Sequence, residues 1–316
     1  MQVNIIPKLL KSVPAPANKS WIIRYMIVSR VKGFECCIRN INLCDDVLAC
    51  MDCLDNAGGL MDAGESATVL RLLVPWLIKK YGRADFICRG NLINRPLGPY
   101  EEIFNVKKEG NILHFEGSLK DKYFISSSIS SQFASGLLIA GAELEGEFVS
   151  GPYIEMTKKV LSMPGPFDVE APADETLSAY FKIGSLEEIN PAEEPDMVPP
   201  YALQCALSPG DTLISDIGRL RFKECDRVRA MAEILCKLGG SVEELKDGLL
   251  IHGKEKLQGG VTLDSYNDHR MVMMAAAAAQ FCQEPVKILN AECVSKSYPA
   301  FFEAYEAAGG EIYVSS

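Results

Sequence analysis

The segment RLRFKECDRVRAMAEILCKLGG, residues 219–240, places many charged side chains in front of an apolar stripe. The charged residues fall within nine positions and are Arg219, Arg221, Lys223, Glu224, Asp226 and Arg227. The apolar residues recur at helical spacing and are Met231, Ile234, Leu235 and Leu238. With two glycines at its end, the pattern predicts an amphipathic helix over 219–240. Cations at its start oppose the helix dipole, so the segment is either a solvated, salt-bridged first turn or a site for an anionic ligand.

The length, composition and net charge limit the classes of protein to which this chain can belong. A chain of 316 residues with 48% hydrophobic and 23% charged residues is expected to form two globular domains. It has no apolar run long enough to span a bilayer, and residues 1–20 lack the apolar core of a secretory signal. We therefore expect a cytoplasmic protein without a membrane partner. A net charge of −10 argues against a nucleic-acid partner and makes local basic clusters more informative.

The cysteines are expected to be reduced thiols rather than disulfides or metal ligands. There are eleven, an odd number, and they are scattered along the chain. Cys50 and Cys53 have CxxC spacing, but they lie inside the helical pattern DDVLACMDCL with no second pair nearby. Packing is therefore favoured over metal binding, and only three histidines are available for a metal site.

One design recurs along the chain: small or polar residues followed directly by an apolar helix. Six segments share it, at 16–31, 65–77, 130–141, 174–186, 195–207 and 267–281. Most have too little polar surface for an exposed helix, so we expect them to be central helices. More amphipathic helices lie between them: DDVLACMDCLDNAGG, YIEMTKKVLSMPG, CDRVRAMAEILCKLGG and YPAFFEAYEAAGG. Strand candidates complete the unit: ECCIRNI, ADFICRG, NILHFEG, GEFVS, DTLISDI, GLLIHG and VKILNAECV.

The starts of the apolar helices carry residues suited to anions. Backbone N–H groups and the positive dipole end make a helix N-terminus a site for phosphate or carboxylate. The residues at these starts include Lys19, Ser20, Ser130, Ser131, Asp196, Asp268, His269 and Arg270. Taken singly, two serines before a helix are an ordinary N-cap. Together with the charges at 219–227, these helix starts favour several helices converging on one anionic ligand.

Several blocks resemble the 5-enolpyruvylshikimate-3-phosphate synthase family, in that family's order from residue 16 to 305. PANKSWIIR resembles its PxDKSxxxR opening, NRPLG its RPM/RPIG turn, and ISSQFASGLL its SSQ helix. VSGPYIEMT, DETLSAYF and EEPDMVPPYALQCA resemble further family segments. RFKECDRVRAMAEILCKLGG resembles the KExDR helix, TLDSYNDHRMVMMAAAAA the YNDHRMAM helix, and CVSKSYPAFFEAY the segment that follows it.

The resemblance implies an α/β (α+β) fold of two domains built from repeated βαβαββ units that close on a cleft. The first domain would be 12–170 and the second 1–11 plus 171–316, with one repeat largely missing near 182–194. The implied reaction transfers the enolpyruvyl group of phosphoenolpyruvate to the 5-hydroxyl of shikimate 3-phosphate and releases phosphate. This is a step of chorismate and aromatic amino acid biosynthesis. No metal or organic cofactor is implied, and we expect a monomer.

The resemblance also assigns roles position by position. Asp196, Glu224 and Lys19 would be catalytic, with Asp196 accepting the 5-hydroxyl proton, Glu224 serving proton transfer at the methylene carbon and Lys19 acting as general acid for the leaving phosphate. The residues that would bind shikimate 3-phosphate are Lys19, Ser20, Arg24, Ser130, Ser131, Ser150, Tyr153, Asp196 and Lys223. Those that would bind phosphoenolpyruvate are Lys19, Arg95, Gln132, Arg227, Arg270 and Lys296.

Some positions depart from the family pattern. The Gly-Asn-x-Gly-Thr turn stands here as GESAT, which puts Glu65 beside an anionic ligand and a methyl group at Ala67. Arg219 stands where the family often has Asn, and stretches are absent after Leu54, after RPLGPYEEIF and between Phe181 and Pro195. Two rival interpretations follow. One is a non-catalytic descendant that binds a phosphorylated metabolite, and the other is a UDP-amino-sugar enolpyruvyl transferase, which would show a reactive loop cysteine.

Overall fold

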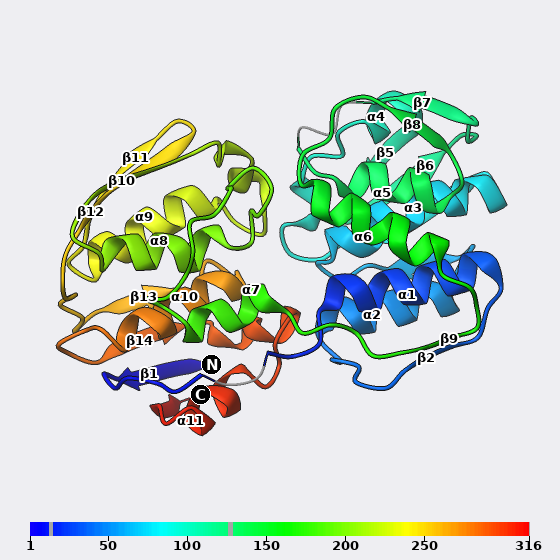
Figure 1. The fold of residues 1–316 in the computed structure, drawn as a ribbon. Helices are drawn as coiled ribbons and strands as arrows, with labels where there is room; N and C mark the ends of the chain where they lie inside the picture. Colours follow the sequence, from blue (N-terminus) through cyan, green and yellow to red (C-terminus); the bar gives the residue numbers. More distant parts are fainter. Residues whose placement is uncertain (13–14, 126–128, 316) are drawn as a thin grey trace. The chain divides into compact units, whose positions relative to one another are not determined.

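The computed structural model describes residues 1–12, 15–125 and 129–315. The chain divides into two compact units, coloured along the sequence in Figure 1. The first unit is Ala17–Pro172, and the second joins Met1–Pro16 to Ala173–Ser316. The boundaries expected from the sequence, after residues 11 and 170, lie a few residues away. In the described part of the chain, none of the helices combines the length and apolar character that crossing a bilayer requires.

The first unit alternates helices with short strands. Its helices are α1 (Lys19–Lys32), α2 (Asp45–Asp55), α3 (Ala67–Tyr81), η1 (Leu92–Asn94), α4 (Tyr100–Ile103), α5 (Gln132–Ile139) and α6 (Gly151–Ser162). Its strands are β2 (Cys36–Ile38), β3 (Leu60–Asp62), β4 (Arg83–Ile87), β5 (Asn105–Glu109), β6 (Ile112–Glu116), β7 (Lys122–Phe124), β8 (Glu143–Glu145) and β9 (Phe167–Val169). They form a four-stranded sheet in the order β3-β4-β6-β5 and two parallel pairs, β2–β9 and β7–β8.

The second unit contains two larger sheets. Its helices are α7 (Glu175–Ser178), η2 (Ala179–Phe181), α8 (Val198–Ala206), η3 (Gly218–Phe222), α9 (Arg227–Lys237), α10 (His269–Ala279), η4 (Ala291–Lys296) and α11 (Phe301–Ala307). Its strands are β1 (Gln2–Ile6), β10 (Gly210–Ser215), β11 (Ser241–Leu245), β12 (Gly248–Gly253), β13 (Thr262–Asp264), β14 (Val286–Leu289) and β15 (Glu311–Ser315). The sheets run β13-β14-β1-β15 and β10-β12-β11.

The two four-stranded sheets repeat one pattern. In each, two parallel strands, β3–β4 or β13–β14, are joined by a buried helix, α3 or α10. Two antiparallel strands then complete the sheet. This is the strand, buried helix, strand unit that the sequence predicts.

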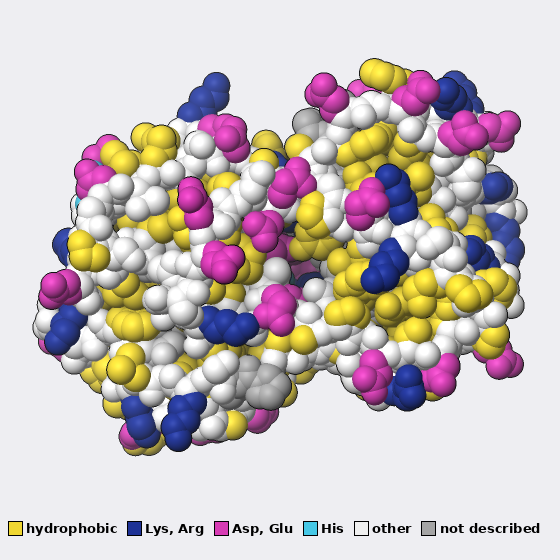
Figure 2. Space-filling view, in the orientation of Figure 1, with side chains coloured by type: hydrophobic (Ala, Val, Ile, Leu, Met, Phe, Trp, Pro, Cys, Tyr) yellow, Lys and Arg dark blue, Asp and Glu magenta, His cyan; other side chains and the backbone are white. Residues whose placement is uncertain are grey.

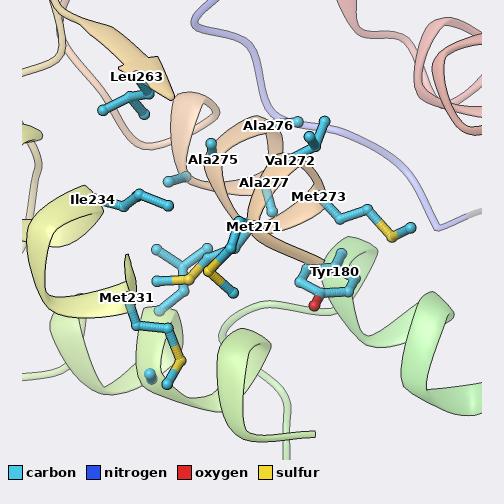
Figure 3. Close-up of a cluster of buried hydrophobic side chains, with 14 of the residues drawn as sticks. Tyr180, Met231, Ile234, Leu263, Met271, Val272, Met273, Ala275, Ala276 and Ala277 are labelled. Carbon is cyan, nitrogen blue, oxygen red and sulfur yellow. The ribbon is translucent and has the colours of Figure 1, made fainter. Parts of the chain in front are cut away.

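Alanine-rich α10 is the centre of the second unit. All of its residues from His269 to Ala279 are buried. Figure 3 shows Met231 and Ile234 of α9 and Tyr180 of η2 lying around Met271 of α10. The small alanine side chains let neighbouring elements approach α10 closely, so its start is fixed by packing along the whole helix.

The segment between Phe181 and Pro195, where the sequence lacks most of a repeat, contains no helix or strand. Two side chains from elsewhere in the second unit hold it in place. The Gln204 side chain accepts hydrogen bonds from the backbone N–H of Gly184 (2.9 Å) and Leu186 (2.8 Å) and donates to the Leu186 carbonyl (2.7 Å). Arg219 donates to the carbonyl oxygens of Pro191 and Ala192. Arg219 therefore has a structural role in the shortened segment.

Several secondary-structure predictions are wrong in detail. The helix expected over 174–186 is shorter and ends with η2 at Phe181. The strand expected at GEFVS, 146–150, lies earlier, as β8. Gly146 has φ +134° and a side chain there would overlap the Ile125 carbonyl, while Ser150 has φ 54°. Both positions turn the chain away from an extended conformation.

The two-stranded β2–β9 sheet leaves apolar side chains exposed in the first unit. A pocket of about 380 Å³ lies among α1, β2 and α2, and its lining includes Phe34, Cys36, Ile41 and Met51. In Figure 2, hydrophobic side chains also gather over the part of this unit where α1 and α6 lie. Parallel strands are normally covered on both faces, so this sheet is unusually bare.

Helices α3 and α5 approach each other closely at Gly136. A side chain there would overlap the Arg71 carbonyl oxygen and the Tyr100 hydroxyl, which are hydrogen-bonded to each other at 2.6 Å. We expect Gly136→Ala to lower the free energy of unfolding by roughly 2–3 kcal/mol through overpacking. Denaturant unfolding followed by circular dichroism measures this. Gly184→Ala, where nothing lies within 4 Å, is the control and should cost less, about 1 kcal/mol from its φ of +95°. Equal losses in both variants would contradict the close approach.

Candidate functional site

In the second unit, Arg227 joins the starts of three helices. It is the first residue of α9, and its side chain is 2% exposed. Its guanidinium bonds Asp268, the N-cap of α10, at 2.7 Å, and Asp196, just before α8, at 3.1 Å. A third bond of 2.7 Å reaches Glu224. Burial alone would lower the pKa of Arg227, but the carboxylates of Asp268, Glu224 and Asp196 raise it well above its ordinary value.

Arg270 makes a second set of links in the same place. It is the second residue of α10, and its side chain is 5% exposed. Its Nη1 donates to the Asp196 carbonyl at 2.9 Å, and its Nε lies 3.3 Å from the Asp196 carboxylate. Its Nη2 donates to the Thr176 hydroxyl at 3.0 Å. Thr176 is the second residue of α7, so Arg270 also contacts the start of that helix. Burial opposes the charge of Arg270, and Asp196 raises its pKa. The two guanidiniums therefore gather the starts of α7, α8, α9 and α10.

The prediction of one helix over 219–240 is wrong at its front end. Residues 218–222 form the 3₁₀ helix η3, and α9 begins only at Arg227. The reason is Asp226, whose side chain caps α9 by accepting from the Arg229 N–H at 3.1 Å. The charged residues before Arg227 thus lie outside the helix, and most of the expected conflict with its dipole does not arise.

The remaining predicted residues of the second unit lie around this cluster. Lys223 Nζ is 4.0 Å from the Asp196 carboxylate, and Lys296 donates to the Asn267 carbonyl at 2.6 Å. The structure therefore brings together all of the residues predicted from this unit, namely Asp196, Lys223, Glu224, Arg227, Arg270 and Lys296.

Cys225 lies within the same cluster. Burial and the Asp268 carboxylate raise the pKa of its thiol, and its Sγ lies 3.6 Å from Asp268 Oδ2. This cysteine is therefore a neutral thiol, unlike a reactive nucleophile.

In the first unit, Arg24 joins three helix starts. It is 1% exposed and donates to the Ser20 carbonyl of α1 (2.9 Å) and the Tyr153 carbonyl of α6 (3.3 Å). Its Nε donates to the Thr157 hydroxyl at 2.8 Å, which lies 2.9 Å from the Ser135 hydroxyl of α5. Burial lowers the pKa of Arg24 to about 10. Among the described residues, no carboxylate forms an ion pair with Arg24.

Lys19 and Asp46 form a half-buried ion pair beside these helix starts. Lys19 Nζ lies 2.7 Å from Asp46 Oδ2, and the side chains are 15% and 14% exposed. Lys19 is the first residue of α1, which is capped by Asn18 rather than by Ser20. The carboxylate of Asp46 fixes the ammonium group near the N-terminus of α1.

The start of α5 supplies the serine pair and Gln132. Ser131 is its N-cap and 4% exposed, and the Ser130 hydroxyl accepts from the Gln132 N–H at 3.2 Å. The Gln132 amide nitrogen donates to Thr68, the second residue of α3, at 2.7 Å. Ser150 is the N-cap of α6 and 3% exposed. The starts of α1, α3, α5 and α6 are thus tied together, as the repeat predicts.

Arg95 is placed by the turn after η1. It is 8% exposed, and its N–H bonds the Leu92 carbonyl at 3.1 Å. The next residue, Pro96, is held through its carbonyl by Arg71 of α3 at 2.9 Å. Arg71 also bonds the Gln132 amide oxygen at 3.0 Å, so Arg95 and Gln132 are connected through one side chain.

The two departures in the GESAT turn have different surroundings. The Glu65 carboxylate packs against Gly90, where a side chain would overlap it. Gly90 has φ +51°, and the neighbouring Arg89 pairs with Asp62. Glu65 is thus directed toward the turn after β4. Ala67 is 3% exposed and is the first residue of α3, after its N-cap Ser66.

Sequence reasoning missed three residues that shape the site: Asp46, Arg71 and Thr157. Arg71 left a signal, because it is the only charged residue in the apolar run ATVLRLLVPWLI. A charge in a buried helix calls for polar partners. Thr157 left one too, as the last residue of the segment VSGPYIEMT, whereas Asp46 sits in an ordinary amphipathic helix and left none.

A metal centre finds no support in the part of the chain that the structure describes, where no group of three or more His, Cys, Asp or Glu side chains is placed to hold an ion.

Comparisons with known proteins point to one family. The family model for EPSP synthase (3-phosphoshikimate 1-carboxyvinyltransferase) matches residues 167–305. A 3-phosphoshikimate 1-carboxyvinyltransferase of Clostridium perfringens is 31% identical and covers 98% of both chains, and one of Clostridioides difficile is 30% identical over 96% of both. The solved EPSP synthase of Acinetobacter baumannii has a TM-score of 0.74 over the whole of both chains at 19% identity. This likeness confirms the predicted fold class.

The alignment with the Clostridium perfringens protein also shows how much shorter this chain is than that relative. It runs over 418 positions, while this chain has 316 residues. At least 102 positions therefore have no residue here, in agreement with the absent stretches recognised in the sequence.

The buried pair of Arg227 and Asp268 is open to a direct stability test. We expect Asp268→Asn to lower the free energy of unfolding by about 3 kcal/mol, because it leaves Arg227 short of a buried counter-charge while keeping a capping side chain. Denaturant unfolding at neutral pH measures this. The control is Arg229→Ala on the same helix, which breaks the exposed pair with Glu233 and should cause a much smaller loss, because solvent screens an exposed ion pair. Indistinguishable losses would refute a special role for the buried pair.

Proposed function

The chain belongs to the 3-phosphoshikimate 1-carboxyvinyltransferase family, and on that premise we propose which of its residues perform the reaction. The enzyme transfers the enolpyruvyl group of phosphoenolpyruvate to shikimate 3-phosphate and releases phosphate. The observation that carries the residue assignment is common to both units. In each, buried guanidiniums tie together the starts of four helices, where N–H groups and dipoles favour anions.

We propose that shikimate 3-phosphate is bound by Lys19, Ser20, Arg24, Ser130, Ser131, Ser150, Tyr153, Asp196 and Lys223. The charge of Arg24 supports this assignment. A buried guanidinium without a carboxylate partner among the described residues is costly, and an anionic ligand would supply the missing counter-charge. The serine hydroxyls at the starts of α5 and α6 are suited to phosphate oxygens.

Phosphoenolpyruvate, in this proposal, is bound by Lys19, Arg95, Gln132, Arg227, Arg270 and Lys296. Guanidinium forks suit carboxylate and phosphate groups because they donate two parallel hydrogen bonds. The Asp196 carboxylate lies against both Arg227 (3.1 Å) and Arg270 (3.3 Å). Asp196 is thus an internal counter-charge, and binding of a substrate anion would share these cations with it.

The chemistry needs proton transfers in an addition step and in an elimination step. In the addition, Asp196 accepts the proton of the 5-hydroxyl as the hydroxyl oxygen bonds the central carbon of phosphoenolpyruvate, and Glu224 in its protonated form donates a proton to the methylene carbon, which becomes a methyl group. Phosphate then leaves, protonated by Lys19, while the methyl group returns a proton to Glu224 and the double bond reforms. Glu224 is held for this role by Arg227 at 2.7 Å and is 18% exposed.

Release of phosphate from the two substrates tests the catalytic assignment. We expect the purified protein to release phosphate only when both substrates are present. Asp196→Ala and Glu224→Gln should each lower kcat by about 10²–10⁴-fold, the usual contribution of a general acid or base. A coupled phosphate assay measures this, with circular dichroism confirming that the variants fold. Asp211→Asn, on an exposed residue, is the control. Folded protein that releases no phosphate would instead be a non-catalytic descendant that binds a phosphorylated metabolite.

The methyl group of Ala67 bears on inhibitor selectivity. It should crowd glyphosate, a bulkier anionic analogue, more than it crowds phosphoenolpyruvate. We expect weak inhibition of the protein by glyphosate, and stronger inhibition of Ala67→Gly by at least about tenfold, the effect of one methylene group in a close contact. Inhibition constants measured against phosphoenolpyruvate test this, with the KM for phosphoenolpyruvate as the internal control. Sub-millimolar competitive inhibition of the unaltered protein would refute the argument.

A further inference from the structure

Helix α3 of the first unit has one charged side chain in its buried stretch. Its residues from Val69 to Ile78 are all buried, and among them only Arg71 is charged. Arg71 is 3% exposed, and its guanidinium lies 4.5 Å from the ring centroid of Phe133. Burying a guanidinium in an apolar helix is costly, so its hydrogen bonds must offset a large desolvation penalty.

The two ends of the Arg71 fork contact two different elements. Nη1 donates to the amide oxygen of Gln132, the first residue of α5, at 3.0 Å. Nη2 donates to the carbonyl oxygen of Pro96, the residue after Arg95, at 2.9 Å. Gln132 and Arg95 are the residues of the first unit that, besides Lys19, are proposed to bind phosphoenolpyruvate. A single planar group therefore sets the spacing between them.

The hydrogen bond from Arg71 also fixes the orientation of the Gln132 amide group. The amide oxygen accepts from Arg71, and the amide nitrogen donates to the Thr68 hydroxyl at 2.7 Å. The reversed amide would place its N–H group against the guanidinium N–H, two donors face to face. With the oxygen held by Arg71, the second amide hydrogen of Gln132 is available to an anion.

The backbone of Arg71 is fixed as well as its side chain. Its carbonyl oxygen accepts from the Tyr100 hydroxyl at 2.6 Å, and α5 approaches it at Gly136. Tyr100 begins α4, which follows the Arg95 turn. The guanidinium therefore has little freedom to move away from Gln132 and Pro96.

We propose that Arg71 is a positioning residue for phosphoenolpyruvate. It orients the Gln132 amide and holds the Arg95 turn, and it acts through these two residues rather than by touching the substrate. This inference rests on the proposed function, because it assumes that Arg95 and Gln132 bind phosphoenolpyruvate. Lysine cannot replace arginine here, since one ammonium group cannot hold two oxygens with the planar fork geometry.

The test compares Arg71→Lys with Lys79→Met. Lys79 lies on the same helix and bonds the Ala140 carbonyl at the far end of α5 (2.8 Å), so it is a matched link between the same two helices. We expect Arg71→Lys to raise the KM for phosphoenolpyruvate by about tenfold or more, because loss of a residue that orients a binding group commonly weakens binding by about this factor. The KM for shikimate 3-phosphate should change by less than about twofold, the reference being the tenfold effect on phosphoenolpyruvate. Lys79→Met should change neither. A folded Arg71→Lys protein with an unchanged KM for phosphoenolpyruvate would overturn the proposal.

A double-mutant cycle separates positioning from general stability. If Arg71 acts partly through Gln132, then Arg71→Lys should raise the KM less in a Gln132→Ala background than in the unaltered protein. Fully additive effects, or equal rises in both KM values together with a lower Tm, would also overturn the proposal.

Failure of the proposed function can be told apart from failure of this inference. The shift of Tm with phosphoenolpyruvate is measured for the unaltered protein and for Arg71→Lys. If the unaltered protein releases no phosphate but is stabilised by phosphoenolpyruvate, the catalytic assignment fails, and a smaller shift in Arg71→Lys still supports positioning. If phosphoenolpyruvate stabilises neither protein, both proposals fail.

Discussion

The structure depends on buried guanidiniums that hold several helix N-termini together. The positive ends of helix dipoles repel one another, and an added cation makes the repulsion worse. In the second unit the repulsion is offset internally, because Arg227 and Arg270 are surrounded by Asp196, Glu224 and Asp268. In the first unit Arg24 has no such partner among the described residues. The first unit is therefore the one whose buried charge most needs an anionic ligand.

This difference between the units suits the chemistry. A transferase for two anionic substrates needs cations to bind them, but its bases must also accept protons. The carboxylates of the second unit, Asp196 and Glu224, are oriented by the same arginine, Arg227. The ion pairs thus fix the orientation of the two carboxylates that we propose as bases, which limits the reorganisation that the proposed reaction would need.

Much of the fold could be predicted from the sequence because the buried helices have an unusual pattern. Long apolar runs that start with polar residues are strong signals. Helices α5, α8 and α10 lie within the expected ranges, whereas α1 and α3 begin inside theirs and extend to Lys32 and Tyr81, past the expected ends at residues 31 and 77. The start of α9 could not be placed, because charged residues from 219 onward fit a helix as well as a turn. Only the capping bond from Asp226 decides it. Side-chain partnerships such as Lys19 with Asp46 depend on tertiary packing, which periodicity does not report.

The shortened repeats change the surface more than the site. Between Phe181 and Pro195 a few hydrogen bonds from Gln204 and Arg219 replace the missing elements, and the core around α10 remains fully buried. In the first unit, β2 and β9 form a two-stranded pair with an apolar pocket beside it. The segment at 182–195 leads directly into Asp196, yet Asp196 keeps its contacts with Arg227 and Arg270. A helix start is fixed by its own packing and by its buried arginine, so outer strands can be lost while the arrangement of charges is kept.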